Sequence, residues 1–71
     1  MLPVLSGEEL VKALKRLGFV EVRQKGSHMK VRHADGRTAI VPMHTEVALG
    51  TLRSIMRQVR ITAEQLGDAL K

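Results

Sequence analysis

The chain has 71 residues and carries 12 Lys and Arg against 7 Asp and Glu, which gives a formal net charge of +5 and a sequence pI near 10.5. A chain of this length can form one domain with a small core, so we expect a single domain over residues 1–71. It contains no cysteine, which excludes disulfides and thiolate metal sites and favours the cytoplasm over an oxidising compartment. The positive charge favours a polyanion or an acidic protein as partner.

The residue types also argue against membrane proteins and against binding by base stacking. No apolar run approaches the roughly 18 residues of a membrane-spanning helix, and the start "MLPVLSGEEL" lacks the basic and apolar regions of a signal peptide. We therefore expect a soluble protein that does not contact a membrane. Phe19 is the only Phe, Tyr or Trp residue, so the aromatic platform on which many RNA-binding domains stack bases is missing.

The first predicted element is a helix in the stretch "SGEELVKALKRLGF". Ser6 and Glu9 have the spacing of a capping box, and Gly18 suits the left-handed conformation that ends many helices. The apolar face consists of residues at helical spacing: Leu10, Val11, Leu14 and Leu17. These features together predict an amphipathic helix.

Three strands are predicted next, between Phe19 and Pro42, because polar and apolar residues alternate there. Asp35-Gly36 favours a two-residue type I′ hairpin turn, which would place Val31 opposite Ile40. A weaker two-residue turn at Lys25-Gly26 joins the first two strands.

These two turns divide the strand residues between two faces of the predicted sheet. The predicted buried face contains Val20, Val22, Met29, Val31 and Ile40. The predicted outer face contains Glu21, Arg23, His28, Lys30, Arg32, Arg37 and Ala39. His28 would therefore project from a cationic surface.

Two helices are predicted after the sheet. The main one runs from about Leu49 to Val59, and a short one near residues 63 to 70 follows a capping box formed by Thr62 and Gln65. The order is α-β-β-β-α with a C-terminal third helix. We expect an α+β fold in which helices cover one face of a three-stranded antiparallel sheet and solvent covers the other.

The order and spacing of these elements resemble the HicA family of toxin ribonucleases. The resemblance rests on the capped first helix, "GSH" at the start of the second strand, "VPMH" at the end of the third, and "GTLRSIMRQVRIT" as the second helix, and it covers about Ser6 to Leu70. It implies a fold like the double-stranded RNA-binding domain, cleavage of mRNA without a metal, and a HicB-type antitoxin that masks the active face. It also implies that His28 is catalytic.

The chemistry of the residues independently favours the same site. Cleavage of RNA by its own 2′-hydroxyl needs proton transfer and positive charge near the phosphate, and histidine exchanges protons near neutral pH. We expect His28 to move protons and the surrounding residues to hold RNA. The predicted RNA-binding residues are Arg23, Lys25, Gly26, Ser27, Lys30 and Arg32.

Other interpretations stay open at this point. His33 shares strand parity with Met29 and is expected at the edge of the buried face, whereas His44 could order the start of the second helix or act beside His28. The spacing of the three histidines does not predict a metal site, and no glycine pattern predicts a nucleotide cofactor. Alternative functions are a non-catalytic module that binds double-stranded RNA and a basic adaptor for an acidic protein.

Overall fold

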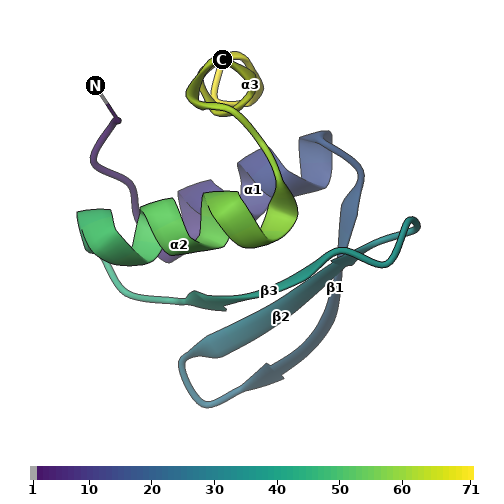
Figure 1. Ribbon diagram of the computed structural model, residues 1–71. Coiled ribbons are helices and arrows are strands. Elements are labelled where there is room, and N and C mark those ends of the chain that lie inside the picture. Colours follow the sequence, from purple (N-terminus) through teal and green to yellow (C-terminus); the bar gives the residue numbers. More distant parts are fainter. Residues whose placement is uncertain (1) are drawn as a thin grey trace.

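The computed structural model describes residues 2–71, and its elements follow the predicted order (Figure 1). The elements are α1 (Gly7–Arg16), β1 (Phe19–Lys25), β2 (His28–His33), β3 (Thr38–Pro42), α2 (Leu49–Val59) and α3 (Ala63–Ala69). The strands form an antiparallel sheet in the order β1-β2-β3. Within residues 2–71, no helix is long and apolar enough to span a membrane.

Helix α1 begins and ends as its sequence predicts. The Ser6 hydroxyl accepts a hydrogen bond from the Glu9 N–H at 3.1 Å, and the Glu9 carboxylate accepts one from the Ser6 N–H at 2.9 Å. Gly18 follows the helix with φ +99°, a conformation that costs a glycine little. Leu10 and Leu14 are completely buried, so the apolar face packs into the core.

The core lies between the helices and one face of the sheet. Figure 1 shows α1 and α2 on the same side of the strands, with α3 beyond them and the opposite face of the sheet bare. Met29 and Val31 of β2 and Ala39 and Val41 of β3 point inward and are buried. The predicted α+β architecture with one open sheet face is confirmed.

The turn between β2 and β3 differs from the prediction. Instead of a two-residue turn, residues 34–36 form the loop: the Gly36 N–H donates to the His33 carbonyl at 2.9 Å, and the His33 N–H donates to the Arg37 carbonyl at 2.8 Å. Gly36 has φ +98°, as in three-residue hairpins that end in a left-handed residue. The extra loop residue shifts the register by one position.

This shift exchanges the two faces of β3, because neighbouring residues of a strand point to opposite sides. Val31 pairs with Ala39 rather than with Ile40. Ala39, predicted on the outer face, is therefore buried, and Ile40, predicted in the core, is 48% exposed. Both predictions were wrong for the same reason.

Strand β1 also differs from its predicted register. The turn is Gly26-Ser27 rather than Lys25-Gly26, and Gly26 has φ +58°, which glycine adopts readily. A β-bulge interrupts the pairing between Glu21 and Arg23. It turns the side chains of the residues before it to the opposite face of the sheet.

The consequence is that several β1 side chains lie on the face opposite to the one expected. Val20 and Val22, predicted in the core, are 60% and 43% exposed. Glu21, predicted on the outer face, lies on the helical side, where its carboxylate is 3.8 Å from the Lys15 ammonium. Arg23 is on the predicted outer face and pairs with Lys30.

The two C-terminal helices follow the prediction. Helix α2 buries Leu52, Ile55, Met56 and Val59, whereas its first residue, Leu49, is 48% exposed. Thr62 and Gln65 form the expected capping box at the start of α3. The Arg16 guanidinium donates to the carbonyl oxygens of Ala69 at 2.7 Å and Lys71 at 3.0 Å, which fastens the end of the chain to α1.

The start of α1 is in close contact with the end of β3. The Gly7 N–H donates to the His44 carbonyl at 2.9 Å, and a Cβ on Gly7 would meet the Pro42 carbonyl oxygen, a backbone atom. One residue further, the Met43 N–H donates to the Ser27 carbonyl at 2.6 Å. These contacts connect α1, through the end of β3, to the turn that precedes His28.

We expect Gly7→Ala to destabilise the protein by about 1–3 kcal/mol, because the added methyl group must push backbone atoms apart. Gly67→Ala is the matched control: its Cβ would have open space inside α3, so this change should stabilise by about 0.5–1 kcal/mol. Urea unfolding followed by circular dichroism gives both free energies. A Gly7→Ala protein as stable as the wild type would show that the close contact is not a constraint.

Candidate functional site

His28 lies at the start of β2, immediately after the Gly26-Ser27 turn, and its side chain is exposed. In the ladder it pairs with Lys25 of β1 and Pro42 of β3. The turn is held from two sides: the Gln24 side-chain amide donates to the Gly26 carbonyl at 3.1 Å, and Met43 donates to Ser27 as described above. His28 is thus presented on the open face from a turn with defined backbone contacts.

A groove of about 470 Å³ surrounds His28 on the open face of the sheet. Its lining consists of Arg23, Lys25, Gly26, Ser27, His28, Lys30 and Ile40. Six of the seven predicted site residues therefore share one hollow. The seventh, Arg32, is two residues further along β2 on the same face and pairs with Val20 and Thr38, outside the lining.

The groove carries uncompensated positive charge. Within residues 2–71, no carboxylate forms an ion pair with Arg23, Lys25 or Lys30, and no acidic residue lines the groove. Glu21, the nearest acidic residue in β1, is turned to the helical side by the bulge. The groove can therefore attract an anion next to an imidazole that can exchange protons.

Ile40 is the residue of this groove that the sequence prediction missed. It pairs with Lys30 across the ladder and supplies an apolar wall. The available signal was the alternative three-residue loop at residues 34–36, which would have placed Ile40 on the same face as His28. The mistaken turn length hid its role.

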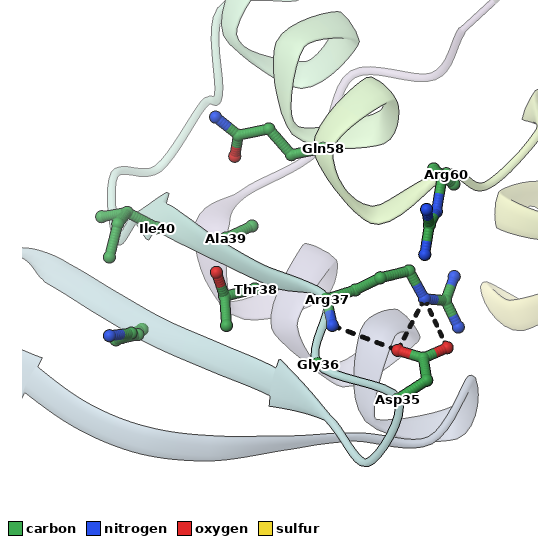
Figure 2. A pocket seen from close by; sticks show the side chains of 9 residues that line it. Asp35, Gly36, Arg37, Thr38, Ala39, Ile40, Gln58 and Arg60 are labelled. Atoms are coloured by element: carbon green, nitrogen blue, oxygen red, sulfur yellow. Dashed lines mark hydrogen bonds and ion pairs between the residues drawn. The ribbon is translucent and has the colours of Figure 1, made fainter.

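A larger hollow of about 740 Å³ lies beside the groove, between β3 and the end of α2 (Figure 2). Its lining residues are Lys30, Asp35, Gly36, Arg37, Thr38, Ala39, Ile40, Gln58 and Arg60. Lys30 and Ile40 line both hollows. The two depressions therefore adjoin at these two side chains, one on the open face and the other extending past β3 towards α2.

Arg37 was predicted on the outer cationic face, but the structure places it at the edge of the core. Its guanidinium lies 5.2 Å from the centroid of the Phe19 ring, donates to the Val59 carbonyl, and is 2.8 Å from the Asp35 carboxylate. Figure 2 shows the Arg37 and Asp35 side chains facing each other. Arg37 therefore connects the hairpin loop to α2 and is not free to bind an external anion.

The other two histidines lie outside the groove. His33 packs edge-on against Phe19 with 5.1 Å between ring centroids, and its Nδ1 accepts a hydrogen bond from the Asp35 N–H at 3.1 Å. This is the expected position at the edge of the buried face. His44 is exposed, its carbonyl accepts from Gly7, and its side chain does not line the groove of His28.

The comparison with known families agrees with the resemblance predicted from the sequence. The model of one family, described as the HicA toxin of bacterial toxin-antitoxin systems, matches residues 7–61. The match begins with α1 and ends just after α2, so it includes the whole sheet and the groove around His28. No individual curated protein matches the chain significantly.

The Arg37–Asp35 pair generates a prediction about acid stability. Hydrogen bonds from Arg37 lower the pKa of Asp35 from 3.8 to about 2. Because the folded-state pKa is the lower one, the stabilisation is fully present above pH 3.8 and is lost as the pH falls towards 2. Asp35→Asn should therefore flatten the fall in unfolding free energy over this range, measured by urea unfolding at successive pH values. Parallel curves for both proteins would contradict this contribution.

Proposed function

Because the chain belongs to the HicA toxin family of bacterial toxin-antitoxin systems, we propose that it is a ribonuclease that cleaves mRNA in the groove around His28. The observation that supports the proposal most directly is the meeting of an exposed histidine with Arg23, Lys25 and Lys30 in one groove without carboxylates. Phosphodiester cleavage requires these two properties together, a proton acceptor and positive charge.

In the proposed reaction, His28 accepts the proton of an RNA 2′-hydroxyl. The 2′-oxygen forms a bond to the adjacent phosphorus, the bond from phosphorus to the 5′-oxygen breaks, and the products carry a 2′,3′-cyclic phosphate and a 5′-hydroxyl. Lys25 lies opposite His28 in the ladder, where the Cβ atoms of directly paired residues are about 5 Å apart. We assign its ammonium the transfer of a proton to the leaving oxygen.

The remaining site residues bind the RNA backbone in this proposal. Arg23 and Lys30 neutralise the phosphate as negative charge develops, and backbone N–H groups of the Gly26-Ser27 turn can face its oxygens. Arg32 extends the positive surface along β2. The single aromatic residue, Phe19, is buried, so recognition relies on phosphate contacts rather than on base stacking.

The proposal predicts that His28→Ala abolishes cleavage, with a loss of about 10²–10⁴-fold in rate, the usual contribution of a general acid or base. The change should leave the fold intact, because the His28 side chain is exposed. The measurement is the rate of cleavage of a single-stranded RNA in EDTA, with circular dichroism as the test of folding.

His44→Ala is the matched control, since it removes an exposed histidine that does not line the groove, and it should cleave like the wild type. Equal cleavage by His28→Ala and the wild type would remove His28 from the mechanism. If neither protein cleaves RNA but both bind it, the chain is a binding module instead.

Membership of the family implies an antitoxin partner, and we propose that a HicB-type antitoxin covers the open face of the sheet. Three apolar side chains are exposed there among the cations: Val20 at 60%, Val22 at 43% and Ile40 at 48%. Exposed apolar groups gathered on one face are typical of protein interfaces. An acidic partner with apolar anchors would fit both features of this face and would exclude RNA from the groove.

We expect Val20→Asp to weaken antitoxin binding at least about tenfold, because it places a negative charge opposite an acidic partner. Val4→Asp is the control, since Val4 is 75% exposed but lies before α1, away from the open face. Isothermal titration calorimetry with the purified antitoxin measures both affinities. Equal affinities for Val20→Asp and the wild type would place the antitoxin on another surface.

A further inference from the structure

Helix α2 ends at a residue whose conformation is unusual for its type. Arg60 has φ +53° and ψ +48°, and it is the one non-glycine residue with positive φ in the described part of the chain. The Arg60 N–H donates to the Arg57 carbonyl at 3.3 Å, and the Ile61 N–H donates to the Met56 carbonyl at 3.1 Å. This is a Schellman motif, in which glycine usually occupies the left-handed position.

An arginine at this position strains the backbone, because a side chain with a Cβ is crowded in the left-handed conformation. The Arg60 side chain is exposed, and across residues 2–71 no hydrogen bond or ion pair engages its guanidinium. Strained left-handed residues other than glycine are found preferentially at functional sites. Arg60 is therefore a candidate functional residue whose exposed guanidinium is available to an external ligand.

Arg60 lines the larger hollow, and it also lines a second hollow together with Arg57. In Figure 2, Gln58 and Arg60 project from the end of α2 over β3, and Arg60 points towards the pair formed by Arg37 and Asp35. The hollow thus contains two arginines and one carboxylate, and that carboxylate is already paired with Arg37 at 2.8 Å. The hollow retains a net positive charge and an amide side chain with both donors and an acceptor.

This hollow is continuous with the groove of His28, because Lys30 and Ile40 line both. A chain of phosphates bound at His28 can pass Lys30 and Ile40 on the open face and continue around the edge of the sheet at β3 to Arg60. Ile40 pairs directly with Lys30, so an apolar and a cationic side chain lie next to each other where the two hollows meet. That combination suits the sugar and phosphate of one nucleotide.

We propose that the hollow between β3 and the end of α2 is a second RNA subsite, in which Arg60 binds a phosphate next to the cleaved one and Gln58 forms hydrogen bonds with the base edge. The inference rests on the proposed cleavage at His28 and extends it to substrate selection. An acidic protein segment is the competing occupant. The continuity with the His28 groove favours RNA, because one strand can fill both hollows.

The test compares Arg60→Gly with Arg57→Gln, each introduced into the His28→Ala protein so that RNA is bound but not cut. Both changes remove one positive charge from the end of α2, but Arg57 does not line the hollow. The probe is a short single-stranded RNA of mixed sequence, and binding is measured over a range of salt concentrations. Arg60→Gly should weaken binding and lower the slope of log affinity against log salt by about 0.7, the value for one lost phosphate contact with a single strand.

Arg57→Gln should bind like its His28→Ala parent. Thermal unfolding shows whether a loss of RNA binding comes from a loss of stability. Because glycine adopts the left-handed conformation readily, Arg60→Gly should unfold at the same or a higher temperature than the parent. Weakened binding by Arg60→Gly alone, without a lower unfolding temperature, would support the subsite. Gln58→Ala would support it further by changing which base is preferred beside the cleavage point in the His28-containing protein.

Three results would overturn the subsite. Unchanged RNA binding by Arg60→Gly would show that RNA does not reach the hollow, even while His28→Ala still abolishes cleavage. Loss of antitoxin binding by Arg60→Gly with unchanged RNA binding would assign the hollow to a protein partner. Absence of RNA binding by the His28→Ala parent, together with absence of cleavage by the wild type, would instead reject the proposed function and the subsite with it.

Discussion

The close approach of Gly7 to Pro42 is the contact on which the arrangement of the site depends. It requires a residue without a Cβ at the first position of α1, and it sets the end of β3 against the helix. From there, the hydrogen bond between Met43 and Ser27 fixes the turn that carries His28. An exposed side chain such as His28 can be held accurately only if its backbone is held, and here the support comes from a helix on the other side of the sheet.

The sequence predicted the elements well because their signals are local. The capping boxes at Ser6 and Thr62, and the apolar spacing of α2, depend on residues within one or two turns of each other, and all three were confirmed. The faces of β1 and β3 were predicted wrongly for Val20, Val22, Ile40, Ala39 and Glu21. One additional loop residue or one bulge moves the side chains of a strand to the opposite face of the sheet. Neither feature has a strong sequence signal.

The candidate site was predicted better than the register, for a physical reason. Gly26, Ser27 and His28 are consecutive, so any turn in this stretch keeps them together. Arg23 and Lys30 line the same groove although their pairing differs from the predicted one. Moving a two-residue turn by one residue shifts the pairing by two positions, which keeps both side chains on the outer face. Ile40, Gln58 and Arg60 could not be found this way, since their proximity to the groove depends on the hairpin loop and on the packing of α2 against β3.

The bulge in β1 has a consequence for the behaviour of the protein at high concentration. β1 is an outer strand of the sheet, and an outer strand with regular, apolar residues can pair with the same strand of another molecule and begin aggregation. Val20 and Val22 are exposed on this strand, which would favour such pairing. The bulge between Glu21 and Arg23 breaks the regular ladder, and charged side chains flank it. We therefore expect the irregularity that turns Glu21 away from His28 to disfavour self-association through the β1 edge as well.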